Sequence, residues 1–142
     1  MARYKRDFKW FAAVSTLTIG CGVYEYTPCA YCGLPAWGTD HVIPKTFCYK
    51  LSDVENVLPH RLWLVPACLE CNSMGGDKVF TSLARKRAFI HQCIRRRYKK
   101  ILRIPEWTKE ERDELSPELA RYVVHGLRLR EIVYSRLRYP KR

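Results

Sequence analysis

The clearest pattern of apolar and polar positions in this chain lies between Thr81 and Leu102. Apolar side chains recur there on one stripe, at Leu83, Ile90, Ile94, Tyr98 and Ile101. This spacing matches a helix with 3.6 residues per turn, and the other faces of the segment are basic. The pattern predicts a helix of about six turns that ends before Pro105, because proline disrupts a helix interior.

Two further helices are indicated by their first residues. Thr108 and Glu111 are spaced as a capping box, which predicts a short helix. Ser116 is suited to the N-cap position and Pro117 to the first helical position of a last helix that runs to about Arg138. This helix alternates arginines with aliphatic residues. It can pack on the long helix or form a homodimer, and the sequence leaves both arrangements open.

The first half of the chain has a different pattern. The stretch from Thr27 to Lys78 is rich in turn-forming residues and cysteine, which leaves room only for short elements. The stretch from Ala2 to Tyr26 mixes basic and aromatic residues and fits either a helix or a strand pair. We therefore divide the chain into a basic and aromatic arm (1–26), a cysteine-containing core (27–80) and a basic helical extension (81–142).

The charge is unevenly distributed between these parts. The 142 residues include 26 Lys and Arg against 14 Asp and Glu, a net charge of +12. Residues 1–78 hold 8 basic and 7 acidic side chains, whereas residues 79–142 hold 18 and 7. Since 47% of the residues are hydrophobic, a chain that is disordered throughout is excluded. The excess favours an acidic partner, and nucleic acid is the first candidate.

Basic side chains of the long predicted helix are the candidates for contact with phosphate. No Asp or Glu occurs between positions 81 and 104, so the charge there is not balanced locally. A solvated face is the usual meaning of such a run, but the lack of acid favours sequence-independent binding of DNA. The predicted nucleic-acid-binding residues are Arg61, Lys78, Arg85, Lys86, Arg95, Arg96, Arg97, Lys99 and Lys100.

Four of the seven cysteines form two C-x-x-C pairs. Cys29 with Cys32, and Cys68 with Cys71, have the spacing of ligands to a tetrahedral zinc ion. Four thiolates leave no open coordination position, so the predicted zinc is structural. The remaining cysteines, at positions 21, 48 and 93, have no such spacing and are interpreted as small hydrophobic residues.

The cysteine count also bears on the compartment. An odd number of cysteines fits poorly with a closed disulfide framework, so we expect a reducing environment, the cytoplasm. An apolar run from Trp10 to Val23 follows basic residues, an order that is also found in signal peptides. Asp7 and Lys9, however, interrupt the start of this pattern. The run is too short to span a bilayer, so no membrane partner is expected.

A family resemblance rests on residues between and beside the cysteine pairs. Asp40-His41-Val42-Ile43-Pro44 lies between the pairs, and Asn72 directly follows the second pair. Over about Cys29 to Lys78 the chain resembles the HNH nuclease superfamily, and its basic tail resembles those of small phage and prophage HNH proteins. The resemblance implies an α+β fold, with a small zinc-stapled ββα-metal core, similar to a treble clef, followed by basic α-helices.

The resemblance also implies an activity, metal-dependent DNA endonuclease. Phosphodiester hydrolysis needs a base for water and a cation at the phosphate. A histidine side chain, with an ordinary pKa of about 6.5, is suited to act as the base for water. The resemblance implies His41 as the general base, with Asp40 and Asn72 holding one catalytic Mg²⁺ or Mn²⁺ through oxygen ligands.

Two positions depart from the family pattern. Trp63 stands where the family usually carries a central Asn, and Gly75 stands where a Lys commonly follows the metal-binding Asn by three residues. The alternative is therefore a non-catalytic zinc-binding module that binds nucleic acid or a partner protein on the same scaffold. Retention of Asp40, His41 and Asn72 together favours the nuclease.

Overall fold

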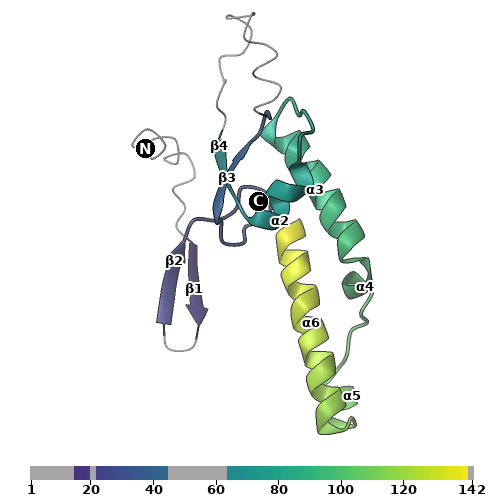
Figure 1. The fold of residues 1–142 in the computed structure, drawn as a ribbon. Coiled ribbons are helices and arrows are strands. Elements are labelled where there is room, and N and C mark those ends of the chain that lie inside the picture. Colours follow the sequence, from purple (N-terminus) through teal and green to yellow (C-terminus); the bar gives the residue numbers. More distant parts are fainter. Residues whose placement is uncertain (1–14, 20–21, 45–63, 141–142) are drawn as a thin grey trace, which may run out of the picture.

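The structure, a computed structural model of the chain, describes residues 15–19, 22–44 and 64–140. Its strands are β1 (Ser15–Ile19), β2 (Gly22–Tyr26), β3 (Gly38–His41) and β4 (Leu64–Ala67), and its helices are α2 (Leu69–Gly75), α3 (Leu83–Arg97), α4 (Lys99–Leu102), α5 (Lys109–Asp113) and α6 (Pro117–Leu137). The strands form small antiparallel pairs, β1 with β2 and β3 with β4 (Figure 1). The predicted α+β class is confirmed.

The core forms where β3, β4 and α2 meet. Strand β3 pairs with β4 from Gly38 opposite Ala67 to His41 opposite Leu64, and every residue of β4 is buried. Helix α2 follows β4 after a single residue and also contacts β3. Val65 of β4 and Ile90 and Ile94 of α3 are completely buried in this core. Burial of such side chains is the main force that holds α3 against the strand pair.

The long helix predicted for Thr81–Leu102 is divided into α3 and α4. The division lies at Tyr98, whose backbone angles (φ −100°, ψ 21°) are not helical. Packing explains the difference, since the Tyr98 hydroxyl is bonded to Glu70 of α2 while α4 packs on α6. The apolar stripe predicted the buried face correctly, but periodicity along one helix does not show where a partner helix bends it.

The predicted starts of the last two helices are confirmed. Thr108 and Glu111 form both hydrogen bonds of the capping box of α5. Ser116 caps α6, and Pro117 is its first residue. Helix α6 packs back on α3 and α4 of its own chain (Figure 1). This is the packing of the last helix on the long helix that the sequence allowed.

Several sequence predictions concern the front of the chain. Within 2–26, where helix and strand pair both fitted, the described residues form the strand pair β1 and β2. The predictions for Arg61, Trp63, Cys21 and Cys48 lie outside the described residues. In the described part of the chain, no helix combines the length and apolar character needed to cross a membrane.

Candidate functional site

The four cysteines of the two C-x-x-C pairs come together in one buried cluster. The Sγ atoms of Cys29, Cys32, Cys68 and Cys71 all lie within 4.8 Å of one another, and each residue is at most 7% exposed. The Sγ atoms of Cys32 and Cys68 are 3.8 Å apart. A tetrahedral zinc ion with Zn–S bonds of about 2.3 Å requires sulfur–sulfur distances of about 3.8 Å. The four cysteines could therefore bind a structural metal such as zinc.

Local backbone structure positions each pair. Gly33, with a φ of +74°, turns the chain after Cys32 and donates its amide to the Cys29 carbonyl at 2.9 Å. Only glycine adopts this conformation readily. Cys68 is the N-cap of α2, and its sulfur accepts a hydrogen bond from the Cys71 amide at 3.5 Å. A tight turn and a helix start thus present two thiols each to the same point.

The thiols of the cluster also perturb one another. The pKa of Cys29 is lowered to about 7, mainly by its hydrogen bond with Cys32. The pKa of Cys68 is also lowered, mainly by its hydrogen bond with Cys29. Hydrogen bonding to Cys29 is likewise the largest cause that raises the pKa of Cys32 and of Cys71. A cysteine binds a metal ion as the thiolate, so a bound cation would replace the protons of these thiols.

Asp40, predicted as a ligand of a catalytic metal ion, is instead held by two side chains of the protein. It is 6% exposed, and its Oδ2 lies 2.7 Å from the ammonium Nζ of Lys86. The Tyr31 hydroxyl donates a hydrogen bond to the same oxygen. Burial, followed by the nearby Asp40 carboxylate, raises the pKa of Tyr31 well above its ordinary value. The Asp40 Oδ2 atom is therefore paired within the protein, with one ammonium and one hydroxyl group.

Lys86 is the one predicted nucleic-acid contact that the described structure corrects. The residue is completely buried, and its Nζ donates to the backbone carbonyl of His41 at 2.7 Å as well as pairing with Asp40. The prediction was wrong because position 86 lies on the face of α3 that also carries Ile90 and Ile94, the face that packs on the core. Its charge is therefore satisfied inside the protein and does not reach a phosphate.

The other two residues implied for catalysis lie on neighbouring elements. His41 is half-buried at the end of β3, and Asn72 is half-buried in α2, directly after Cys71. The backbone carbonyl of Asn72 accepts the amide of Gly76 at 3.2 Å, as part of the helix end. Strand β3, which carries Asp40 and His41, is in contact with α2, which carries Asn72.

The remaining predicted phosphate contacts that the structure describes are on the surface. Arg85, Arg95, Arg96, Lys99 and Lys100 are exposed on α3 and α4, and Arg103 follows them. Lys78 is also exposed, with its Nζ 4.1 Å from the centre of the Phe89 ring. Arg97 is partly engaged within the protein, because it forms an ion pair with Glu70 at 2.9 Å. We call Arg85, Arg95, Arg96, Lys99, Lys100 and Arg103 the basic surface.

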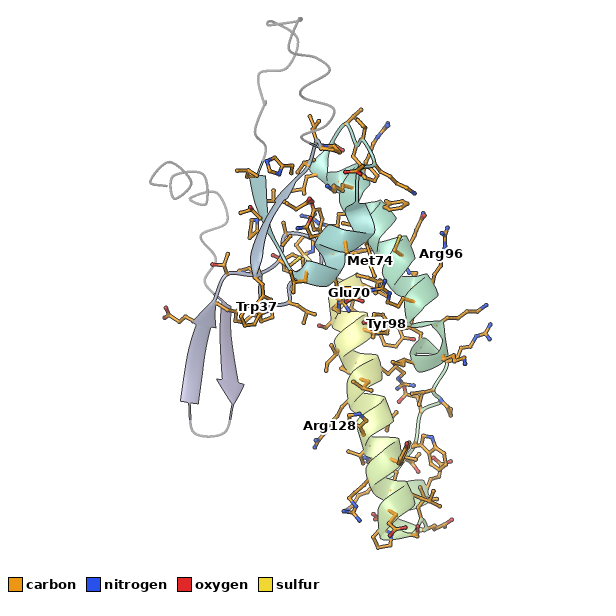
Figure 2. All side chains as sticks on the ribbon, viewed as in Figure 1. Trp37, Glu70, Met74, Arg96, Tyr98 and Arg128 are labelled. Atoms are coloured by element: carbon orange, nitrogen blue, oxygen red, sulfur yellow. The ribbon has the colours of Figure 1, made fainter. Side chains whose placement is uncertain are left out.

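Sequence reasoning missed Glu70, which joins the cysteine cluster to the helices. Its carboxylate accepts hydrogen bonds from Arg97 (2.9 Å), the Tyr98 hydroxyl (2.7 Å) and Arg136 of α6 (2.6 Å). Figure 2 shows Glu70 and Tyr98 at the junction of α2, α3 and α6. Burial alone raises the pKa of Glu70, but these hydrogen bonds lower it overall. Its position between Cys68 and Cys71 was the available sequence signal.

Arg136 connects α6 to the same cluster. Its side chain is 4% exposed and bonded to Glu70. Burial lowers the pKa of Arg136, but the charges of Cys32 and Glu70 raise it by more, so the net shift is upward. A zinc ion with four thiolates carries a net negative charge, and a buried guanidinium close to it is a favourable counter-ion.

Comparison of the chain with protein-family models, with curated protein sequences and with solved structures gives no match. The structure therefore defines the class only as an α+β protein with a four-cysteine cluster that is compatible with zinc.

Proposed function

We propose that this chain is a DNA-binding protein in which a zinc-stapled core holds the helices that contact the phosphate backbone. The observation that carries the proposal is the basic surface of α3 and α4. Its side chains are exposed, and no Asp or Glu occurs between positions 81 and 104. An unbalanced positive surface of this kind attracts DNA by releasing its counter-ions, largely without regard to base sequence.

The spacing of the basic residues suits a row of phosphates. Arg85 and Arg96 are separated by eleven residues, about three helical turns, so they project from the same face of α3. Lys99 and Lys100 continue the charge into α4. In Figure 2, Arg96 points outward from α3, whereas Arg128 lies on the opposite side, on α6. DNA bound along α3 and α4 would therefore leave the outer side of α6 free.

The binding proposal predicts a local effect of charge removal. The triple variant Arg96→Gln, Lys99→Gln and Lys100→Gln is expected to bind a DNA duplex at least about tenfold more weakly, since three phosphate contacts are lost. In a salt titration by fluorescence anisotropy, the slope of log Kobs against log salt should become less negative by about 3.

The matched control is Arg121→Gln, Arg128→Gln and Arg138→Gln, which removes three exposed charges from α6 and its end. Both variants have the same net charge, so a purely global electrostatic effect would weaken binding equally. We expect the control to retain most of the affinity and the salt slope. Equal losses in the two variants, or no binding of DNA by the unaltered protein, would contradict the proposal.

A second candidate function is phosphodiester hydrolysis, the activity implied by the resemblance to HNH nucleases. It is favoured by the order β3, β4 and α2, with Asp40 and His41 on the strand and Asn72 on the helix. On this proposal the three elements form a ββα-metal unit, and His41 takes a proton from water. The candidate requires Asp40 to separate from Lys86, because its Oδ2 is paired with that ammonium.

Hydrolysis is tested with supercoiled plasmid. The unaltered protein and His41→Ala are incubated with plasmid and Mg²⁺, Mn²⁺ or a chelator. If the chain is a nuclease, the unaltered protein converts the plasmid to nicked or linear DNA only with a divalent ion, and His41→Ala slows this by about a hundredfold or more, the usual size of a general-base contribution. If both proteins slow the migration of the plasmid in a gel but leave it intact, the result contradicts the nuclease proposal and supports the binding proposal.

A further inference from the structure

We infer that Lys86 is a built-in cation of this core, and that its ammonium occupies the place at Asp40 that a divalent ion would take in the nucleases the sequence resembles. The inference concerns the core and does not depend on the binding of DNA. It rests on three observations: the contacts of the Lys86 ammonium, the space that Gly75 leaves for the lysine side chain, and the pairing of the Asp40 carboxylate with Lys86 and Tyr31.

The surroundings of the Lys86 ammonium are those of a small cation site. Its Nζ lies 2.7 Å from Oδ2 of Asp40 and 2.7 Å from the carbonyl oxygen of His41. The centres of the Tyr31 and Phe80 rings are each 5.9 Å from it, so the faces of two aromatic rings are turned toward the charge. The residue is completely buried. A carboxylate oxygen and a backbone carbonyl oxygen are also typical ligands of hard divalent ions.

Gly75 leaves the space through which the lysine side chain passes. A Cβ atom at position 75 would lie 2.7 Å from Cε and 3.3 Å from Nζ of Lys86, so the end of the lysine side chain would have to shift. Gly75 is helical and has no positive φ, so its backbone does not require glycine. The close approach of Lys86 accounts for it. At the position where the resemblance implies a lysine, this chain has a glycine, and the end of the Lys86 side chain from α3 lies close to it.

The Asp40 carboxylate is consequently already paired within the protein in the absence of a divalent ion. Its Oδ2 receives both the Lys86 ammonium and the Tyr31 hydroxyl. A divalent ion on this carboxylate would lie within a few ångströms of a like charge that is shielded from solvent, which disfavours binding. Removal of the Lys86 side chain alone would leave the buried Asp40 carboxylate without its cation. A metal ion could then take the place of the ammonium group.

Manganese binding tests the inference on the zinc-loaded protein. Titration with Mn²⁺, followed by the EPR signal of the free ion, is expected to show the same binding in the unaltered protein and in Asp40→Asn. Lys86→Met is expected to gain a site with an affinity at least about tenfold higher, since a nearby like charge is removed. The double variant Lys86→Met and Asp40→Asn should lose that site again, and only Lys86→Met should gain thermal stability on addition of Mn²⁺.

Comparison of the unaltered protein with Asp40→Asn is enough to overturn the inference. One equivalent of Mn²⁺ bound by the unaltered protein and lost in Asp40→Asn would show that Lys86 does not hold the site. This comparison stays decisive even if Lys86→Met fails to fold. Gly75→Ala is a second probe that keeps both charged groups, and it should lower the thermal stability, whereas Gly38→Ala, with open space around its added Cβ, should not. DNA affinity, measured separately, distinguishes failure of this inference from failure of the proposed function.

Discussion

Replacement of both Cys68 and Cys71 with serine is expected to abolish zinc binding and the ordered core. These residues supply two of the four clustered thiols and also form the start of α2. Structural zinc contributes about 10–16 kcal/mol of apparent binding free energy in small zinc domains, as much as the whole stability of a typical domain. The double variant should contain less than about a tenth of an equivalent of zinc, because two remaining thiols do not complete a tetrahedral site.

Metal content and thermal unfolding check this result together. The matched control is Cys93→Ser, which alters a half-buried cysteine of α3 outside the cluster. It should keep one zinc per chain and a cooperative unfolding transition. Retention of a full equivalent of zinc by the double variant would contradict the four-cysteine assignment. A chelator should reproduce the effect of the double variant on the unaltered protein.

Glu70→Gln is expected to lower the free energy of unfolding by about 3 kcal/mol, because it removes the carboxylate that is paired with a buried guanidinium. The side chain of Arg136 is 4% exposed, and its ion pair with Glu70 is 2.6 Å long. The same change weakens the bonds from Arg97 and Tyr98, so α3 and α6 lose a shared attachment to α2. Urea unfolding followed by circular dichroism measures the loss.

The control for Glu70 is Glu131→Gln. Glu131 pairs with Arg138 on the surface, where the two side chains are 68% and 66% exposed, so its loss should change stability by no more than about 0.5 kcal/mol. Addition of Arg136→Met to Glu70→Gln should recover much of the stability, since it removes the unpaired buried charge. Zinc content should stay at one equivalent. Equal effects of the two glutamate variants would show that Glu70 does not organise the junction.

Short-range features of the chain were predictable from the sequence. Thr108 with Glu111, and Ser116 with Pro117, start helices as predicted, since a capping hydrogen bond joins residues only three apart. The grouping of Cys29, Cys32, Cys68 and Cys71 was also predictable, because each pair satisfies a spacing that metal coordination demands. In each case the interaction that decides the structure is local, or is tied to a motif with a known geometry.

The role of individual charges was decided by packing. The same basic run contributes an exposed Arg96, an Arg97 paired with Glu70, and a completely buried Lys86. Composition does not distinguish these three, and helical periodicity assigned only apolar residues to the buried face. A lysine joins that face when a carboxylate from another element is present to pair with it.

The sequence by itself determined the four-cysteine cluster and the basic helical half, because these follow from composition, spacing and local hydrogen bonds, and the α+β class followed from the family resemblance. Only the tertiary structure decided what Asp40 and Glu70 contact. The partner of Asp40 is Lys86 on α3, which bonds to the His41 carbonyl across 45 residues, and Glu70 reaches Arg136 across 66. Such contacts depend on how β3, α2, α3 and α6 pack together, and no local pattern in the chain specifies that arrangement.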